Sequence, residues 1–173
     1  GCVFAGRESD NSTMVEALAM LNKGEITQEE YDRLEADSNP SCGSCSFLGT
    51  ANTMCAVTEA LGMSLPGSSM IPAVMAERRR VARASGRRIV DMVREGLTAR
   101  KIINKSGLEN ALKLGMAIGG STNMELHFPA IGYEADCGFT IDDVDRIARA
   151  TPHLANIYPN GPENVPAFYR AGG

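Results

Sequence analysis

The chain contains the stretch Ser38-Asn-Pro-Ser-Cys-Gly-Ser-Cys-Ser-Phe-Leu-Gly-Thr-Ala-Asn-Thr-Met54, in which two cysteines lie in a turn rich in glycine, serine and proline. The turn leads directly into a helical pattern that starts near Thr50. Cys42 and Cys45 therefore lie close to the positive end of a helix dipole, where a thiolate is stabilised and suited to bind metal. The Cys-x-x-Cys spacing is typical of metal or redox sites. We expect a chemical role for at least one of the two thiols rather than two small turn residues.

The other cysteines give a different picture. The chain has five cysteines and nine methionines and shows no secretory signal, which favours a reducing, cytoplasmic environment over a disulfide framework. No second Cys-x-x-Cys and no Cys/His pair at zinc-finger spacing is present, so a complete zinc site is not expected. Cys55 falls inside the helical pattern and is predicted to be a core thiol. Cys2 and Cys137 have no local partner, and we expect both to be structural.

Size and charge bound the remaining possibilities. With 173 residues, 43% of them hydrophobic, the chain is predicted to form one domain with a real core. No apolar run approaches the roughly 18 residues of a membrane-spanning helix. The net charge of −4 gives no overall attraction to nucleic acid. The basic run from Arg78 to Arg88 alternates with apolar residues, as on a packed amphipathic helix, so we expect it to serve assembly or solvation.

Helical signals dominate the rest of the chain. Possible capping boxes begin at Thr13, Thr27, Ser106 and Thr140, and each precedes a run with helical spacing. A further helix is predicted from Ser69 to a stop at Gly86, followed by another that ends at Gly96. Strand signals are limited to residues 3–4 and 154–158. Because the chain begins without methionine and ends on Ala-Gly-Gly after a helical pattern, we expect residues 1–173 to be an internal fragment, truncated at both termini.

A third element with chemical potential is the loop Gly119-Gly-Ser-Thr-Asn123, which ends one helical pattern and precedes another that contains His127. Its backbone N–H groups, the hydroxyls of Ser121 and Thr122 and the amide of Asn123 are suited to hold a carboxylate or phosphate. No Gly-Lys-Ser/Thr follows, so the loop is not a Walker motif. A helix stop with a close backbone approach is the alternative. His127 is as compatible with a satisfied, half-buried histidine as with a catalytic one.

Taken together, Cys42 to Met54, Glu59-Ala-Leu-Gly-Met-Ser-Leu-Pro-Gly67 and Gly119 to Asn123 with His127 resemble the dihydroxy-acid dehydratase/6-phosphogluconate dehydratase family in order and spacing. The resemblance implies a hydro-lyase that dehydrates a 2,3-dihydroxy acid to a 2-keto acid. It implies an α/β, helix-rich fold, part of an N-terminal αβα domain with a small parallel sheet, and about a third of the family's polypeptide. It further implies a small-molecule substrate, no nucleic-acid or membrane partner, and a homodimer or homotetramer at full length.

The same resemblance implies an iron–sulfur cluster, [2Fe-2S] or [4Fe-4S], and Mg²⁺. Cys45 matches the family's last cluster cysteine, whereas Cys42 matches a cysteine common in one branch and is at most a possible ligand. Ser121, Thr122 and Asn123 match a signature implied to line the substrate site. The remaining cluster cysteines, the Mg²⁺ ligands and a serine base match segments outside these residues. We therefore expect no catalytic residue in this chain, and no activity from it alone.

The residues that bear on the choice of substrate resemble two different branches of the family. Asn39 and Gly49 replace a cysteine and an aromatic residue that branched-chain enzymes tend to have, whereas Asn52 resembles the branched-chain type. Residues 158–161 and 168–173 resemble sugar-acid dehydratases. We expect a dihydroxy-acid dehydratase of branched-chain amino-acid biosynthesis, with a sugar-acid (aldonate or 6-phosphogluconate) dehydratase as the alternative. A thiol redox module would need a thioredoxin-like βαβ pattern that the sequence lacks, and a helical module for nucleic acid is opposed by the acidic net charge.

Overall fold

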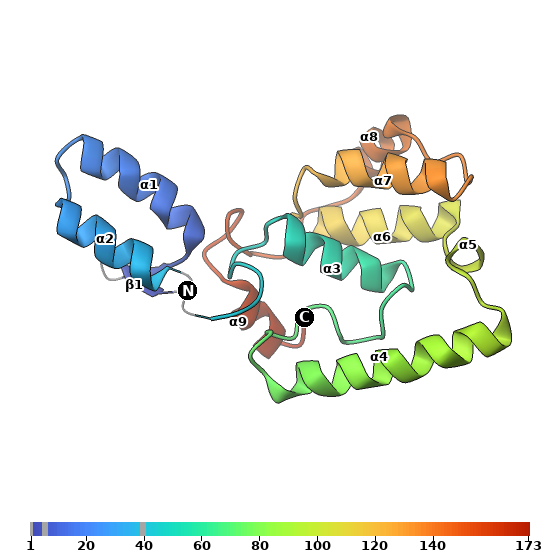
Figure 1. Cartoon of the computed structure of the whole chain (residues 1–173). Coiled ribbons are helices and arrows are strands. Elements are labelled where there is room, and N and C mark those ends of the chain that lie inside the picture. Colours follow the sequence, from blue (N-terminus) through green and yellow to red (C-terminus); the bar gives the residue numbers. More distant parts are fainter. Residues whose placement is uncertain (1, 5–6, 39–40) are drawn as a thin grey trace.

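The computed structural model describes residues 2–4, 7–38 and 41–173, and its described elements are mostly helices (Figure 1). The Asn39 substitution and the side chain of Cys2, for which we predicted roles, lie outside what the structure describes. The elements, in chain order, are β1 Cys2–Phe4, β2 Arg7–Ser9, α1 Asn11–Asn22, α2 Gln28–Asp37, α3 Thr50–Ala60, α4 Ala76–Glu95, α5 Ala99–Ile102, α6 Lys105–Ala117, α7 Met124–Glu134, α8 Ile141–Ala150 and α9 Val165–Arg170.

The predicted helix-rich character is confirmed, whereas the small parallel sheet is not found among the described residues. Their only sheet pairs β1 with β2 in antiparallel register, Cys2 opposite Ser9. The predicted strand at residues 154–158 forms a single parallel bridge, Ile157 to Glu163. The N–H groups of Leu154 and Ala155 donate to the Ala117 carbonyl at the end of α6. The start of residues 154–158 thus bonds to the end of α6, and among the described residues no second strand pairs with this segment to form a ladder.

The main core lies among α3, α6, α7 and α8, where α3 and α6 run side by side (Figure 1). Leu108 and Leu112 of α6 are fully buried against Val57 of α3 and Phe128 of α7. A second buried cluster connects α3 to the segment before α9 and includes Leu48. Its remaining buried members are Ala56, Met70, Ile118, Ile157 and Val165. This second cluster lies beneath the cysteine-containing turn and gives it a fixed base.

Several predicted helix boundaries are confirmed and others are corrected. Thr27 caps α2 through a capping box with Glu30, as predicted. The box predicted at Thr13 is shifted, because Asp10 is the N-cap of α1 and Thr13 is its third residue. Asn104 caps α6 in place of Ser106. These shifts follow from Asp and Asn, which accept backbone N–H groups as well as Ser or Thr does.

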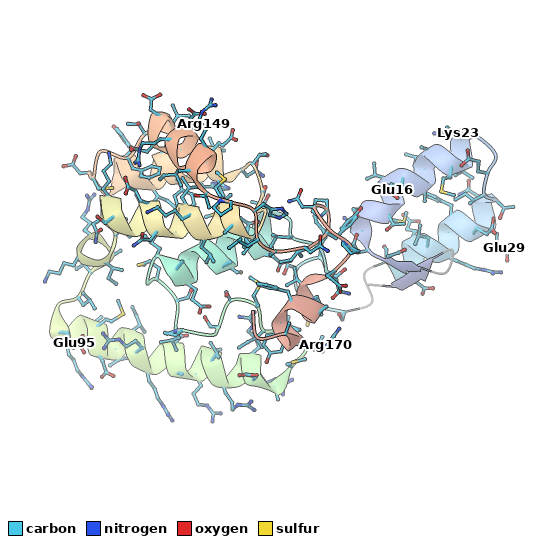
Figure 2. All side chains as sticks on the ribbon, turned by 180° about the vertical axis from the view of Figure 1, so that it is seen from behind. Glu16, Lys23, Glu29, Glu95, Arg149 and Arg170 are labelled. Carbon is cyan, nitrogen blue, oxygen red and sulfur yellow. The ribbon has the colours of Figure 1, made fainter. Side chains whose placement is uncertain are left out.

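The prediction that Gly86 ends a helix is wrong, because α4 continues through it to Glu95 and ends at Gly96 in the left-handed conformation. A glycine inside a helix costs only about 1 kcal/mol relative to alanine, too little to interrupt a 20-residue helix. None of the residues of α4 is buried, and Glu95 at its end points outward, as does Arg149 on α8 (Figure 2). No described helix is both long enough and apolar enough to cross a membrane.

Candidate functional site

The cysteine turn, residues 41–49, is held by the side chain of Asn52 in the first turn of α3. The Asn52 amide Nδ2 donates to the carbonyl oxygens of Cys45 (2.8 Å) and Phe47 (2.7 Å). Its Oδ1 accepts a hydrogen bond from the Ser44 hydroxyl at 2.6 Å. Asn52 is buried, whereas Ser44 is exposed and Cys45 and Phe47 are half-buried. One side chain therefore sets the backbone on both sides of Cys45.

The opposite side of the cysteine turn is bonded to the C-terminal segment and to Asp10. The Leu48 N–H donates to the Tyr158 carbonyl at 2.8 Å, and the Val165 N–H donates to the Ser46 carbonyl at 2.8 Å. The Ser46 hydroxyl donates to Oδ2 of Asp10 at 3.0 Å. The second half of the turn is thus anchored by Asp10, 36 positions away, and by Tyr158 and Val165, more than 100 positions away, while residues 41–44 are exposed.

Three cysteines line one pocket of about 490 Å³, which we call the cysteine pocket. Cys45 is half-buried, whereas Cys42 is exposed at the rim. Cys55 was predicted to be a core thiol, and this is wrong: it lies exposed on α3 and lines the same pocket. The reason is helical periodicity, since the buried residues of α3 share one face of the helix and Cys55 lies on the opposite face; the buried residues are Asn52, Thr53, Ala56 and Val57. Cys137 is half-buried beside the main core, and its thiol donates to the Gly132 carbonyl at 3.6 Å, as expected for a structural cysteine.

The far wall of the cysteine pocket comes from the segment between α3 and α4, and Arg78 completes it. The Arg78 guanidinium donates to the carbonyls of Ser68 (2.8 Å), Ser69 (3.3 Å) and Ile71. Gly43 lies against this wall with φ of +114°, and a Cβ there would come within 2.8 Å of the Ala73 methyl group. The Arg78 bonds thus hold the wall itself, and the close approach of Gly43 to Ala73 shows that the turn packs tightly against this wall.

The same wall is fixed from its N–H side by Glu59 of α3. The Glu59 carboxylate accepts hydrogen bonds from the N–H groups of Gly67 (2.5 Å) and Ser69 (2.8 Å). Burial alone would raise the pKa of Glu59, but the hydrogen bonds from Ser69, Gly67 and Ser68 together outweigh it and hold the pKa below its usual value. The acidic residue at the start of the Glu59–Gly67 motif is thus an anchor for the wall.

The glycine loop, residues 119–123, lies against the start of α3, next to the cysteine turn. The Ser121 N–H donates to the Thr53 hydroxyl at 3.0 Å, and the Asn123 amide donates to the Thr50 hydroxyl at 2.7 Å. The Ser121 and Thr50 hydroxyls are 3.1 Å apart. Two motifs that are about 70 residues apart in the sequence therefore meet at the N-terminus of one helix.

The two glycines of this loop form a helix stop of the Schellman type. The Gly120 N–H donates to the Gly115 carbonyl (2.8 Å), the Gly119 N–H donates to the Met116 carbonyl (3.1 Å), and Gly119 has φ of +73°. A Cβ on Gly120 would lie 2.7 Å from the Thr53 methyl group. The two glycines therefore act as a helix stop, as the alternative predicted. The hydroxyls of Ser121 and Thr122 and the amide of Asn123 follow directly after this stop.

The three predicted substrate-binding residues differ in exposure. Thr122 and Asn123 are exposed and Ser121 is half-buried, and none of them lines the cysteine pocket. Asn123 is the N-cap of α7 but makes no side-chain cap bond, so its amide is directed to α3 instead. His127 is half-buried on α7, which leaves both alternatives for it open.

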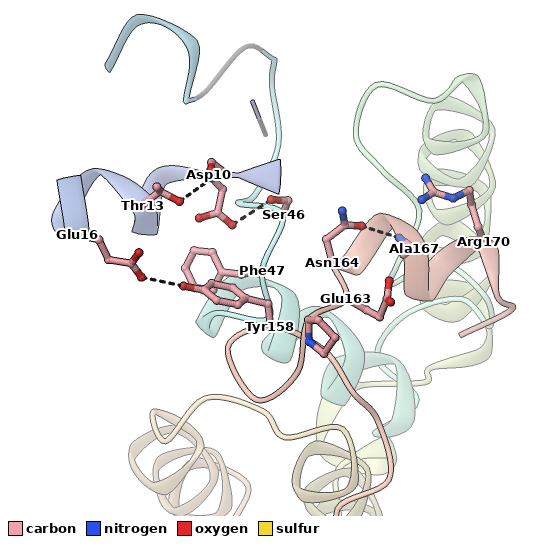
Figure 3. Close-up of a pocket in the computed structure, with 12 residues that line it drawn as sticks. Asp10, Thr13, Glu16, Ser46, Phe47, Tyr158, Glu163, Asn164, Ala167 and Arg170 are labelled. Carbon is pink, nitrogen blue, oxygen red and sulfur yellow. Dashed lines mark hydrogen bonds between the residues drawn. The ribbon is translucent and has the colours of Figure 1, made fainter. Parts of the chain in front are cut away.

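A second cavity of about 500 Å³ lies behind the cysteine turn, and sequence reasoning did not find it (Figure 3). Phe47 and Tyr158 meet there edge to face, with ring centroids 6.2 Å apart. Asp10, Glu16 and Arg170 also line it. Its lining comes from both ends of the chain, and no local pattern marks such a cavity. Ser46 lines both this cavity and the cysteine pocket, so the turn forms the partition between them.

The donor set of the cysteine pocket fits one thiolate ligand to a metal group and not a complete metal site. Among the residues that the structure describes, no three His, Cys, Asp or Glu side chains lie close enough together to hold a metal ion. Cys45 remains accessible from the pocket, and its backbone is fixed by Asn52. This is the arrangement expected of a single ligand whose companions are elsewhere.

Comparison with known proteins gives a consistent result. Residues 1–173 match the model of the dihydroxy-acid/6-phosphogluconate dehydratase N-terminal family. A dihydroxy-acid dehydratase of Thermodesulfovibrio yellowstonii is 46% identical over 167 residues, which are 96% of this chain and 30% of that protein. One of Methanospirillum hungatei is 44% identical over 97% of this chain and 31% of its own length. One of Methanothrix thermoacetophila is 49% identical over 84% of this chain and 26% of its own length.

The chain thus spans about 30% of the length of the curated relatives that it matches. The family match extends over both motifs that meet at α3, the cysteine turn and the glycine loop. On this evidence the chain belongs to the dihydroxy-acid/6-phosphogluconate dehydratase family, in which it matches the N-terminal part.

Proposed function

We propose that the protein to which this chain belongs is a hydro-lyase that removes water from a 2,3-dihydroxy carboxylic acid to give a 2-keto acid. The relatives named dihydroxy-acid dehydratase support this activity. The single observation that carries it is the position of Cys45, half-buried in a pocket and fixed by the buried Asn52.

Within that activity, Cys45 would provide one thiolate ligand to an iron–sulfur cluster. When bound, such a cluster supplies an iron that acts as a Lewis acid toward the leaving hydroxyl, because hydroxide is a poor leaving group. This chain's contribution is to hold the thiol in the turn just before α3, with its backbone fixed by Asn52. Cys42 is exposed at the rim and is not required as a ligand. The Mg²⁺ ligands and the base are proposed to lie in other parts of the polypeptide.

Ser121, Thr122 and Asn123 are proposed to contact the substrate. This role is supported by the position of Ser121 and Asn123 beside the N-terminal turn of α3, where they bond to Thr53 and Thr50. Thr122 is exposed and its side chain makes no cap bond to α7. Its hydroxyl is therefore available to a polyhydroxy acid.

For the substrate we propose a branched-chain dihydroxy acid, because the relatives are named dihydroxy-acid dehydratases. A sugar acid is the second candidate, favoured by Gly49 in place of an aromatic residue. Gly49 is closely packed, since a Cβ there would lie 2.7 Å from the Phe47 ring. A larger residue would therefore require Phe47 to move.

We further propose the properties that accompany this function in a complete enzyme. They are an αβα N-terminal domain with a small parallel sheet, of which residues 1–173 are an internal part, a homodimeric or homotetrameric assembly, and a cytoplasmic location. The isolated 173-residue chain is proposed to be inactive and to hold no stable cluster, because one ligand cannot retain it.

The test is a keto-acid assay on the full-length protein after anaerobic iron–sulfur reconstitution with Mg²⁺. Turnover of 2,3-dihydroxyisovalerate at a kcat/KM well above that for gluconate and 6-phosphogluconate would support the proposal. The reverse preference would replace it by the sugar-acid alternative. No keto acid from any of these acids, with the cluster present, would reject the hydro-lyase function. The isolated chain serves as the negative control.

A further inference from the structure

The wall of the cysteine pocket is formed by residues 69–74, and residues 67–71, which lead into and begin this wall, are held by two opposite charges. On its N–H side the Glu59 carboxylate accepts from Gly67 and Ser69. On its carbonyl side the Arg78 guanidinium donates to Ser68, Ser69 and Ile71. The two side chains come from different helices, α3 and α4, and between them they fix a segment that has no regular secondary structure of its own.

Only Arg78 of this pair lines the cysteine pocket. The described residues that line it include cysteines, serines, Asn52 and apolar groups, and Arg78 is their one charged side chain. The three acceptors of its guanidinium are neutral carbonyl oxygens, and none of the ion pairs found among the described residues involves Arg78. A carbonyl satisfies a donor without cancelling its charge, so the one charge carried by the side chains that line the pocket is positive.

A second hollow beside the cysteine pocket also contains Arg78. Arg78 and Cys55 line this smaller adjoining hollow together, so both hollows that Cys55 borders are also bordered by Arg78. The neighbouring Arg79 and Arg80 are exposed on α4 and line neither hollow. The basic run of α4 therefore divides into solvated arginines and one arginine directed to the site.

We infer that Arg78 selects for an anionic group in the cysteine pocket and keeps the pocket wall in place. It is a positioning residue with an electrostatic role. The charge itself follows from the pocket alone, whereas the identity of the anion, an anionic iron–sulfur cluster or a substrate carboxylate, rests on the proposed function.

The first experiment uses the full-length protein before cluster reconstitution and compares two alkylating reagents. Iodoacetate is anionic and iodoacetamide is neutral, and both react with the same thiolate by displacement of iodide. The ratio of their rate constants at one pH therefore cancels the thiolate fraction and reports the local potential. Peptide mapping assigns the rates to Cys42, Cys45 and Cys55.

The expected result is a fall of roughly threefold in the iodoacetate/iodoacetamide ratio at Cys55 and Cys45 in Arg78→Gln. The matched control, Arg79→Gln on the same helix, should leave the ratio unchanged. Arg78→Lys keeps the positive charge but cannot make the three hydrogen bonds of the guanidinium. Its iodoacetate/iodoacetamide ratio should therefore stay near that of wild type, while its rate of reaction with iodoacetamide rises. An unchanged ratio in Arg78→Gln would overturn the inference.

Should Arg78→Gln fail to fold, the wild-type chain still decides the matter. Raising the salt concentration from about 0.02 M to about 0.5 M shortens the screening length about fivefold and should lower the ratio at Cys55. The ratio at Cys137, which lies away from the pocket, should change less. Equal salt dependence at Cys55 and Cys137 would contradict a positive potential in the pocket.

The second experiment uses the full-length enzyme with its cluster and identifies the anion. If the anion is the cluster, Arg78→Gln should lower its reduction potential, because a positive charge nearby favours the added electron, while KM stays unchanged. If it is the substrate carboxylate, KM should rise and the potential should not move. Both results support anion selection, whereas no change in either would overturn it. Absence of any cluster in wild type would instead count against the proposed function.

Discussion

Asn52→Ala is the perturbation that most sharply tests how the cysteine turn is held. The substitution removes three hydrogen bonds, to the Cys45 and Phe47 carbonyls and from the Ser44 hydroxyl. Ser44 is exposed, so water replaces its bond at little cost. The Phe47 carbonyl retains a bond from the Gly49 N–H, whereas the half-buried Cys45 carbonyl loses the partner described here.

At about 1 kcal/mol for each of the two bonds to carbonyls, with a further contribution from the space left by a buried side chain, the loss should be about 2 to 3 kcal/mol. For a chain of this size that corresponds to a fall in Tm of roughly 4–12 °C. The assay is urea unfolding with matched Asn110→Ala, an exposed residue on α6, as the control.

Alkylation gives the second readout of the same variant. Loss of the amide should free the backbone around Cys45 and raise its rate of reaction with iodoacetamide, while Cys137 in the main core reacts as in wild type. An unfolding free energy within about 0.5 kcal/mol of wild type, together with an unchanged Cys45 rate, would refute the conclusion that Asn52 holds the turn.

The remaining predictions concern charge and the glycine loop. Glu59→Gln should destabilise the chain at pH 7, because it loosens residues 67–71. The folded-state pKa of Glu59 is lowered from 4.5, so the difference in unfolding free energy between wild type and variant should be present above pH 4.5. This difference should disappear as the pH falls through the lower folded-state pKa. Asp143 has its pKa lowered to about 2 by hydrogen bonds from Arg146, Lys105 and the Thr140 N–H, so the stability lost in Asp143→Asn should be present above about pH 4 and vanish between pH 4 and pH 2, as pH-dependent unfolding would show. Thr122→Val should lower kcat/KM of the full-length enzyme with little effect on cluster content or Tm, whereas Thr27→Val, which removes the N-cap of α2, should cost about 1 kcal/mol of stability without affecting kinetics; a stability loss in Thr122→Val with normal kinetics would remove the glycine loop from the site.

Local signals in the sequence predicted much of the helical framework. The helix after the cysteine turn starts at Thr50 and is followed by Gly62 with φ of +83°, because the turn and the glycine set both ends locally. Thr27 with Glu30 likewise caps its helix as predicted. Gly86 misled the prediction because a weak local cost is overridden within a long helix.

The site was less predictable, because its geometry depends on residues far apart in the sequence. The motifs containing Cys45 and Ser121 were recognised separately, but their meeting at Thr50 and Thr53 is a tertiary contact. Asn52 was noted for its bearing on the substrate and not for its bonds to the turn. Arg78 is one of several arginines in a basic run, and nothing local distinguishes the one whose side chain turns to the pocket.

The most direct test of the central claim is a pair of substitutions, Cys45→Ser and Cys42→Ser, in the full-length protein reconstituted with iron and sulfide under anaerobic conditions. Iron content and visible absorption are measured on both, with Cys55→Ser as a control for a third thiol of the same pocket. We expect Cys45→Ser to lose the cluster absorption and the dehydratase activity, and Cys42→Ser to retain both. A Cys45→Ser protein with wild-type iron content, absorption and turnover would contradict the claim.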